Sequence, residues 1–541
     1  MATYSVVPEI PPNQWPPITK ALYINLALIT SGGMMRDDLF SRGTVRGTAD
    51  DILQQKTPID YMDVFPKEIS TERVVTLIEG RPGSGKTTLI TKVSRDWAKE
   101  DILKNVGLLI LVHLRRFMGK SDLTIADMIG IYCKSSTVVQ DLVERFERTG
   151  GEEVCFAFDG LDEYTSEMER GNLIYDLIHG YRLPKASIFL TSRPAGSHKL
   201  RKWVKQNIEI VGFLKDEIAQ YIKYYYENNP VKAASLTTYL QNRPNISHMC
   251  YLPLHLAMAV YLFDECDEKL PDTETEMYMT FTMQTLRRSI EKELRPSEGD
   301  DLEFHEIDDL TPEKLKIFER MCHLAFEATH RKKLVFTGKE ILKEKVLPVV
   351  PSRDDFNSLG LLTVDRQLAE RALPTKTFSF LHLTLQEFLS ACYLLRQCTD
   401  HEQLKAIAEH GSKIHMRMVW KFYCGLSSSN NIFLESFNAI AKQNISNRLA
   451  LLHMLHCAFE SQRHEACGHL LEHICGNINV QDITLSPHDC SILGYVMSNA
   501  ADKVTELDLS YCHLGPSGMD AFAKQLQCPL PNLHLLRWVY Q

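Results

Sequence analysis

The sequence of 541 residues lacks the features of a secreted or membrane-spanning protein. Its N-terminus does not show the basic and then apolar residues of a secretion signal, and no apolar run approaches the ~20 residues that cross a bilayer. None of its 14 cysteines forms a Cys-x-x-Cys pair, so we expect reduced, mostly buried thiols. We therefore predict a cytoplasmic protein without a membrane span.

Excess positive charge is also missing, because 69 Asp and Glu outnumber 60 Lys and Arg. A net charge of -9 argues against a protein that mainly binds phosphodiester backbone, so we do not expect a nucleic-acid partner. The basic run HKLRKWVK at 198–205 is better explained as a solvated helix face. Apolar residues make up 44% and charged residues 24%, which is typical of a globular chain of three or four domains.

Strand patterns are concentrated in one part of the chain. Residues 71–212 alternate short apolar runs with amphipathic helical segments, and the runs lie at 74–79, 107–114, 154–159 and 187–192. This alternation predicts an α/β fold with a parallel sheet covered on both faces. From 213 to about 475 helical periodicity dominates instead.

The end of the chain has a different pattern. Leu507, Leu509 and Leu514 are followed by Gly515 and a helical segment, which is the unit of a leucine-rich repeat. A degenerate unit precedes it at 483–497, and another begins at 530–536. The sequence therefore predicts a short leucine-rich repeat segment.

The strongest motif is GRPGSGKT at 80–87, which fits the phosphate-loop pattern GxxxxGK[ST] in full. The apolar run before it predicts a strand, and the residues after it predict a helix that turns its positive dipole end toward the anion. Lys86 is expected to reach the β- and γ-phosphates, and Thr87 to ligate Mg²⁺. The predicted nucleotide-binding residues here are Gly80, Arg81, Pro82, Gly83, Ser84, Gly85, Lys86, Thr87 and Thr88.

Acidic residues follow the apolar run 154–159. Asp159 ends that run, where open α/β sheets bind ligands, and we predict it as a second Mg²⁺ ligand beside Thr87. Asp162 or Glu163 could orient or polarise an attacking water, and the sequence does not separate the two.

An arginine follows the next apolar run. Arg193 could reach a γ-phosphate and distinguish a triphosphate from a diphosphate, and a strand-end arginine in a salt bridge is the alternative.

Histidines and cysteines crowd between 453 and 475, where a zinc site is conceivable. Their spacings fit no closed zinc finger, so we favour helical packing. The residues concerned are His453, His456, Cys457, His464, Cys467, His469, His473 and Cys475.

Five segments beyond the phosphate loop resemble the NACHT domain and following domains of NOD-like receptors, within the STAND class of P-loop switches. DGLDE, which begins with Asp159, is similar to the extended acidic motif of that family, and LTSRP is similar to its sensor segment. YLPLHLAMAV (251–260) resembles the helical segment whose proline lines the adenine pocket. LPDTETEMYMTFTMQTLRR (270–288) and FSFLHLTLQEFLSACYLL (378–395) are similar to the entry and the histidine motif of the winged-helix domain.

This resemblance implies two further nucleotide contacts, Pro253 at the adenine and His382 at the diphosphate of ADP. Judged by the residues alone, Pro253 is a helix-starting proline and His382 a surface or capping histidine. The resemblance also implies six segments: an N-terminal segment, partly extended, at 1–70, a NACHT domain at 71–212, a first helical domain at 213–272, a winged-helix domain at 273–396, a second helical domain at 397–476 and truncated leucine-rich repeats at 477–541.

What the resemblance implies for function is an ATP/ADP-dependent cytosolic switch in innate immune signalling. ADP would hold it closed, and a γ-phosphate at Arg193 and Lys86 would favour an open form that associates with itself or with related receptors. Mg²⁺ and weak ATPase activity are expected, and the upstream ligand is not identified by the sequence. Two alternatives stay open: a multiple-turnover P-loop NTPase, and a regulatory scaffold without an effector that dampens related receptors.

The sequence departs from the family pattern in two respects, and the first of them, the missing effector, suggests the scaffold alternative. The first 70 residues are too few for the death-fold effector that family members usually carry, and about two repeats are fewer than the three that a stable solenoid needs. We therefore expect a fragment or a short isoform.

Overall fold

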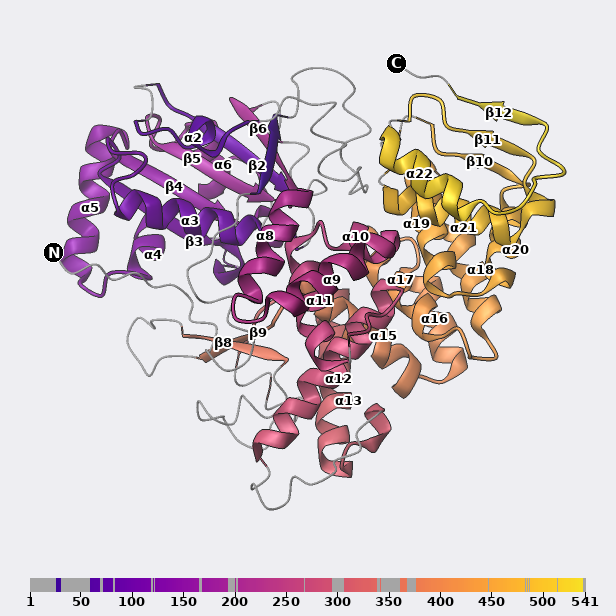
Figure 1. The fold of residues 1–541 in the computed structure, drawn as a ribbon. Helices are drawn as coiled ribbons and strands as arrows, with labels where there is room; N and C mark the ends of the chain where they lie inside the picture. Colours follow the sequence, from indigo (N-terminus) through magenta and orange to yellow (C-terminus); the bar gives the residue numbers. More distant parts are fainter. Residues whose placement is uncertain are drawn as a thin grey trace.

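The computed structural model describes the larger part of the chain in three regions (Figure 1): a sheet domain, a helical middle and a C-terminal group of short strands and helices. The described residues are 26–30, 59–68, 72–80, 83–117, 120, 122–164, 168–192, 200, 203–266, 268–293, 306–337, 341, 361–366, 376–445, 447–481, 483, 485, 487–512 and 514–538.

The sheet domain contains a six-stranded sheet in the order β1-β6-β2-β5-β4-β3. Its strands pair in parallel except β1, which pairs antiparallel with β6 at one edge. The predicted parallel sheet is confirmed, with the four apolar runs forming β2 to β5. The strands are β1 (Ala27–Thr30), β2 (Val75–Gly80), β3 (Leu108–His113), β4 (Val154–Asp159), β5 (Ser187–Ser192) and β6 (Gln206–Gly212).

Two strands of this sheet were not predicted. The strand β6 begins with the polar residues Gln206 and Asn207, and Glu209 interrupts its apolar residues. Its sequence therefore does not show a continuous apolar run. The strand β1 lies inside the N-terminal segment at 1–70, which we expected to be only partly extended, and β1 pairs antiparallel with β6. Long-range pairing therefore formed strands that the local pattern did not indicate.

Helices cover both faces of the sheet. Alternate residues of each strand point to opposite faces and so join different cores. Phe156 and Phe158 of β4 join the core on the side of α4 to α6, whereas Cys155 and Ala157 join the core on the side of α3. The covering elements are α2 (Tyr61–Val64), α3 (Lys86–Ala98), η1 (Leu114–Phe117), α4 (Ile125–Gly130), α5 (Ser136–Thr149), η2 (Leu161–Glu163) and α6 (Leu173–His179).

The helical middle packs around one continuous apolar core that begins at Phe213 and extends into the C-terminal group. Its largest fully buried side chains include Trp420, Tyr278 and Phe388. The helices are α8 (Lys215–Tyr225), α9 (Pro230–Asn242), α10 (Pro244–Met249), α11 (Pro253–Glu265), α12 (Glu274–Glu293), η4 (Ile307–Asp309), α13 (Pro312–His330), α15 (Leu383–Gln397), α16 (Asp400–His410), η6 (Ile414–Met416), α17 (Arg417–Leu426), α18 (Phe433–Asn444), α19 (Arg448–Glu460) and α20 (His464–His473).

A small antiparallel sheet interrupts these helices between α13 and α15. Its order is β7-β9-β8, with β7 (Phe336–Thr337), β8 (Leu362–Arg366) and β9 (Lys376–Phe380). The strand β9 ends directly before α15, so the sheet fixes where that helix starts. The assignment of this region as a winged-helix domain stays a prediction, as do the other domain boundaries.

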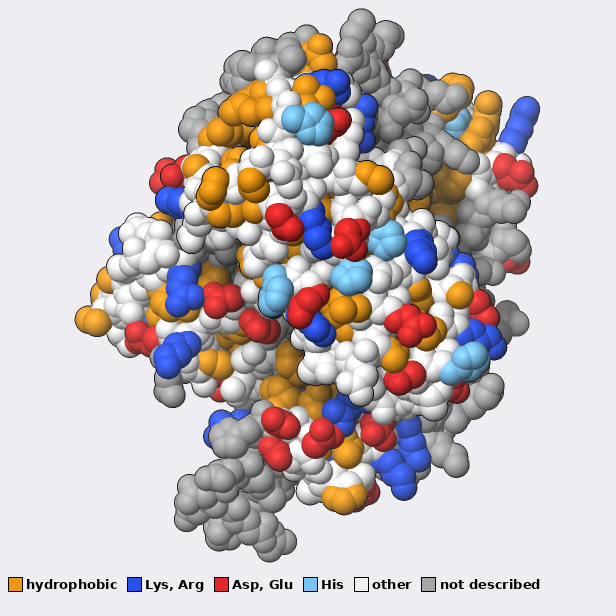
Figure 2. Space-filling model, turned by 90° about the vertical axis from the view of Figure 1, so that its right-hand side faces the viewer, with side chains coloured by type: hydrophobic (Ala, Val, Ile, Leu, Met, Phe, Trp, Pro, Cys, Tyr) orange, Lys and Arg blue, Asp and Glu red, His pale blue; other side chains and the backbone are white. Residues whose placement is uncertain are grey.

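The C-terminal group alternates short parallel strands with helices. Its sheet has the order β10-β11-β12, with Leu507 of β11 between Ile478 and Leu536 of its neighbours. Acidic, basic and histidine side chains are interspersed on the face that Figure 2 shows. The elements are β10 (Asn477–Asn479), α21 (Pro487–Asn499), η7 (Ala501–Lys503), β11 (Glu506–Asp508), α22 (Gly515–Gln525) and β12 (Leu535–Arg537).

Among the residues that the structure describes, none of the helices combines the length and the apolar character that crossing a bilayer requires.

Candidate functional site: a phosphate loop and a buried carboxylate

The phosphate loop connects β2 to α3 and depends on its glycines. Gly83 and Gly85 have φ values of +74° and +94°, which side chains rarely adopt. A Cβ atom at Gly80 would lie 2.4 Å from Ser84 Oγ, and one at Gly83 would lie 2.9 Å from Leu254 Cβ. The loop therefore has no room for larger residues at these positions.

The start of α3 leaves donors available for an anion. Gly85 is the N-cap of α3 and supplies no side-chain hydrogen bond to the first turn. Ser84 Oγ is buried and has no hydrogen-bond partner within the described chain. Lys86 Nζ donates to the Gly80 carbonyl at 2.7 Å, so the cation lies over its own loop. Amide groups at a helix start, a hydroxyl and an ammonium group together fit a phosphate group.

Asp159 is the buried carboxylate of the site, and side chains from one helix and two strands position it. Thr87 Oγ1 of α3 donates to Asp159 Oδ2 at 2.9 Å, and Thr191 Oγ1 of β5 donates to Oδ1 at 2.6 Å. His113 at the end of β3 places Nδ1 3.0 Å from Oδ2. Burial on its own raises the pKa of Asp159, but the contacts with His113, Thr191 and Thr87 outweigh it and lower that pKa. The carboxylate is therefore kept ionised.

The sequence missed His113 and Thr191 as site residues. His113 lies 46 residues before Asp159, and Thr191 lies 32 residues after it. The signal was present, because His113 ends β3, Thr191 is the next-to-last residue of β5, and both strands neighbour β4. The carboxyl ends of parallel strands meet at one sheet edge. Thr191 also accepts from the Gly160 amide at 2.9 Å, which fixes the turn after Asp159.

The remaining sequence-predicted residues of this edge differ in how they are placed. Asp162 is half-buried in η2, the turn that follows Asp159, and Glu163 ends that turn. Thr88 is exposed on the first turn of α3. Arg81, Pro82 and Arg193 lie outside the described residues, as does the side chain of Glu163.

The helical middle contacts the phosphate loop at the start of α11. Pro253 is the first residue of α11, and the amide of the next residue, Leu254, donates to the Gly83 carbonyl at 3.3 Å. Gly212 at the end of β6 has a φ of +132°, and a Cβ atom there would lie 2.3 Å from the Tyr251 carbonyl oxygen. The chain segment that contains Pro253 is thus held against both β6 and the phosphate loop.

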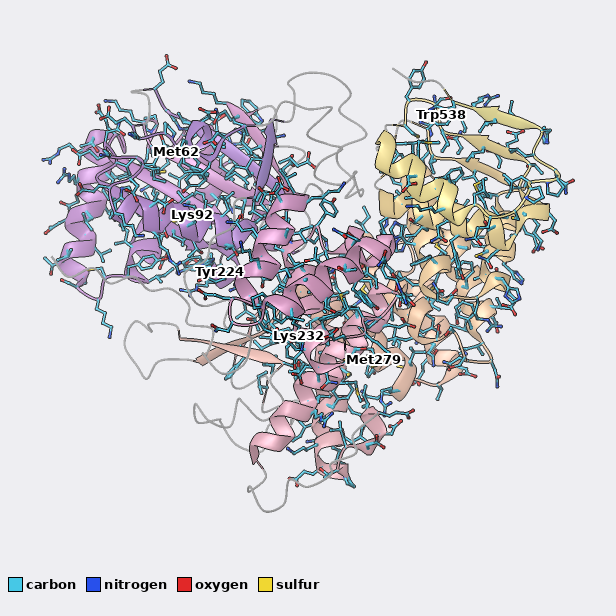
Figure 3. All side chains as sticks on the ribbon, viewed as in Figure 1. Met62, Lys92, Tyr224, Lys232, Met279 and Trp538 are labelled. Atoms are coloured by element: carbon cyan, nitrogen blue, oxygen red, sulfur yellow. The ribbon has the colours of Figure 1, made fainter. Side chains whose placement is uncertain are left out.

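The N-terminal strand also reaches the loop. A Cβ atom at Gly85 would lie 3.0 Å from Leu26 Cδ1, directly before β1. Tyr61 Oη donates to Asp96 Oδ2 of α3 at 2.7 Å, and Lys92 of α3 lies 4.5 Å from the centre of the Tyr61 ring. Figure 3 labels Met62 and Lys92 in this part of the sheet domain. Residues before β2 therefore form part of the surroundings of the site.

His382 is the N-cap of α15. Its Nδ1 accepts a hydrogen bond from the Thr384 amide at 3.1 Å. This geometry is the capping role that the residues alone indicated. Because Nδ1 accepts, the neutral ring carries its proton on Nε2. Contact with a nucleotide stays a prediction for this residue, as it does for Pro253.

The histidines and cysteines between 453 and 475 have protein partners. His456 Nε2 lies 2.7 Å from Asp489 Oδ1, Cys457 Sγ lies 3.5 Å from His453 Nε2, and His473 Nε2 lies 2.9 Å from Asn438 Oδ1. Within the described residues, no group of three or more His, Cys, Asp or Glu is arranged to hold a metal ion.

A glycine-rich loop between a parallel strand and a helix, with an aspartate at the end of another strand, defines a nucleotide-binding domain of the P-loop class. Residues 74–229 match the family model described as "NACHT domain". The chain thus contains a NACHT domain.

Several curated proteins are similar at low identity. "NACHT, LRR and PYD domains-containing protein 3" of Rattus norvegicus is 23% identical, and the aligned region covers 87% of this chain and 49% of that protein. "Nucleotide-binding oligomerization domain-containing protein 2" of Homo sapiens is 25% identical, and the aligned region covers 63% of this chain and 33% of that protein. The chain spans about half or less of the length of these relatives, and its similarity to the Rattus norvegicus protein extends over more of the chain than the NACHT match at 74–229.

One solved structure illustrates how far the likeness extends. A signal transduction ATPase with numerous domains and a tetratricopeptide repeat sensor, from Pyrococcus horikoshii, is 12% identical. The match covers 84% of this chain and 62% of that chain with a TM-score of 0.29, which is too low to support an argument about function.

Proposed function

We propose that the protein is a cytosolic nucleotide-operated signalling switch of NOD-like receptor type, closed with ADP and self-associating in an open form. The observation that carries this proposal is the contact between the phosphate loop and α11, through the Leu254 amide and the Gly83 carbonyl. A bound nucleotide at the loop would act on the helical middle through this contact. ATP or ADP, rather than another anion, is proposed from the NACHT match.

Thr87 and Asp159 are the residues that would hold Mg²⁺. Their side-chain oxygens are 2.9 Å apart, and Mg²⁺ prefers oxygen ligands. Bound Mg²⁺ neutralises charge on the β- and γ-phosphates. His113 and Thr191 orient Asp159 toward Thr87, and Lys86 would move from the Gly80 carbonyl to phosphate oxygens. Arg193 would sense the γ-phosphate, and Asp162 or Glu163 would orient water in slow hydrolysis.

The closed form is proposed to include Pro253 at the adenine and His382 at the diphosphate. The Nε2 proton of His382 supports this, because an imidazole donor suits a phosphate oxygen. Moving such an equilibrium from 1:99 to 99:1 requires about 10⁴-fold differential affinity, or ~5.5 kcal/mol. A few charge-assisted hydrogen bonds of about 1.5–3 kcal/mol each could supply most of it.

The C-terminal group is proposed to be a short leucine-rich repeat segment. Its parallel strands β10, β11 and β12 alternate with α21 and α22, which is the repeating unit of such solenoids. Innate immune signalling, and partners that are further copies of the chain or related receptors, are proposed from the named relatives.

The proposal is tested by the size of the protein as a function of nucleotide. We expect light scattering to give monomers with ADP and larger assemblies with a non-hydrolysable ATP analogue. Lys86→Ala should remove the response, and Lys99→Ala at the exposed C-cap of the same helix is the control. Assembly that is identical with either nucleotide and in Lys86→Ala would contradict the switch. Steady-state turnover near ~10 s⁻¹ would favour a true NTPase instead.

Ligand linkage gives a second readout. ADP at ~100 times its Kd should add about 2.7 kcal/mol to the free energy of unfolding of the domain that binds it. The same ADP addition should leave the unfolding of Lys86→Ala unchanged. Co-purification with a death-fold partner, without assembly of the chain, would point to the scaffold alternative.

A further inference from the structure

A cluster of charged side chains lies deep in the helical middle, outside the nucleotide site. Lys421 Nζ of α17 is 2.5 Å from Glu274 Oε2 at the start of α12 and 3.5 Å from Glu460 Oε1 at the end of α19. The side chains of Lys421, Glu274 and Glu460 are 7%, 10% and 0% exposed. Glu274 of α12 and Lys421 of α17 are 147 residues apart in the sequence. Their charges come together only in the folded chain.

The cluster is tied to α12 by further polar contacts. Thr275 donates to Glu460 Oε2 through its amide at 2.9 Å and through Oγ1 at 2.6 Å. A Cβ atom at Gly425 of α17 would lie 2.4 Å from Thr275 Oγ1, so α12 and α17 approach closely here. The first turn of α12 is therefore held between α17 and α19.

The other side of the cluster faces α11. His255 Nε2 lies 3.6 Å from Glu274 Oε1, and the His255 ring packs edge-on against Tyr278 of α12 with centroids 6.0 Å apart. His255 is one residue after Leu254, whose amide donates to the Gly83 carbonyl of the phosphate loop. Glu274 thus lies between α11, which contacts the phosphate loop, and Lys421 of α17.

We propose that the Lys421–Glu274–Glu460 cluster transmits the state of the phosphate loop from α11 to α17 and α19. This inference rests on the proposed nucleotide binding and names a route by which that binding reaches α17 and α19. Met279 in Figure 3 marks α12 at the centre of the molecule, between the sheet domain and the C-terminal elements.

Charge makes this route sensitive to small displacements. A buried carboxylate is stable as an ion only while its cation and hydrogen-bond donors stay in place. Burial raises the pKa of Glu274, but Lys421 and His255 outweigh it and lower that pKa, whereas burial raises the pKa of Glu460. Of the neighbouring groups, Lys421 stabilises the ionised form of Glu274 most strongly, followed by His255. A shift of α11 that moves His255 would therefore change the stability of the ionised Glu274.

The test is hydrogen–deuterium exchange of the full chain with and without ADP. We expect ADP to slow exchange in α3 and also in α17 and α19, the latter by about fivefold or more, which is the lower end of measured coupling between sites. In Glu274→Gln, ADP should still slow exchange in α3 but should change α17 and α19 less than about twofold.

Glu460→Gln is the matched control. It also removes one buried carboxylate, but it leaves Lys421, Glu274 and His255 in contact, so α17 should keep its response to ADP. Glu274→Gln leaves one lysine and one glutamate in the cluster, which balance each other in charge. If that variant does not fold, His255→Gln interrupts the same route on the α11 side and should have the same effect on exchange.

The outcomes separate this inference from the proposed function. Slowed exchange in α3 without any change in α17 and α19 of the unaltered protein would overturn the relay and leave nucleotide binding intact. No slowing in α3 would instead contradict nucleotide binding, and the relay with it. Equal responses of α17 in Glu274→Gln and in the unaltered protein would show that coupling does not pass through Glu274.

Discussion

Two buried carboxylates, one in the sheet domain and one in the helical middle, are kept ionised in different ways. Asp159 is surrounded by two hydroxyl groups and an imidazole that come from strand ends and a helix start. Glu274 lies against a buried lysine. The hydroxyl donors around Asp159 can rearrange around an added cation. Glu274 already has a cation beside it, the ammonium group of Lys421. The first carboxylate therefore suits a metal ligand, whereas the second already forms a buried ion pair.

The largest expected effect tests the structural ion pair. Lys421→Met leaves Glu274 and Glu460 buried without their cation and should lower the free energy of unfolding by about 3–5 kcal/mol. Urea denaturation measures this loss. Lys503→Met breaks the exposed pair with Glu472 and serves as the control, with an unfolding midpoint close to that of the unaltered protein.

A triple variant sharpens the same point. Combining Lys421→Met with Glu274→Gln and Glu460→Gln removes all three charges and should restore most of the stability, because neutral side chains of similar volume replace buried ion pairs well. If the triple variant is as unstable as Lys421→Met alone, side-chain packing rather than charge explains the loss.

A smaller effect is expected from Asp159, the proposed Mg²⁺ ligand. Asp159→Asn should weaken Mg²⁺-dependent ADP binding by about tenfold or more, ~1.4 kcal/mol, because an amide is a poorer Mg²⁺ ligand than a carboxylate. Its free energy of unfolding should change by no more than about 1 kcal/mol, since the amide oxygen still accepts hydrogen bonds. Titration calorimetry with Mg²⁺ and with a chelator measures the first effect. An undiminished Mg²⁺ dependence in this variant would remove Asp159 from the metal site.

A smaller effect is expected from the residue that positions Asp159. His113→Ala removes a hydrogen bond to Asp159 Oδ2 and should weaken Mg²⁺-dependent ADP binding by about fivefold, ~1 kcal/mol. His113→Gln keeps a side-chain donor and should recover much of the affinity. Equal losses in both variants would show that His113 fills space and does not orient the carboxylate. Binding in the presence of a chelator should be similar in all three proteins.

The two regions also differ in how far the sequence predicted them. The phosphate loop was predictable because its glycines, Lys86 and Thr87 act within eight consecutive residues, and strand and helix patterns flank them. Asp159 was predictable from its place at the end of an apolar strand. His113 was not, because its role depends on the neighbouring position of β3 and β4 in the sheet order.

The helical middle was less predictable for a physical reason. The pairing of Lys421 with Glu274 joins residues 147 apart, and nothing in either local pattern distinguishes a buried charge from a solvated one. The strands β1 and β6 were missed for a similar reason, since their partners lie far away in the sequence. Sequence patterns indicate local geometry, and long-range charge pairs need the fold.

The proposed switch depends on an adenine nucleotide that binds the phosphate loop and to which the rest of the chain responds. Its most direct test is to denature the purified protein and identify the nucleotide released. We predict ADP, close to one molecule per chain, and none from Lys86→Ala prepared in the same way. A protein that releases no nucleotide and also fails to bind ADP with Mg²⁺ on titration would contradict the claim.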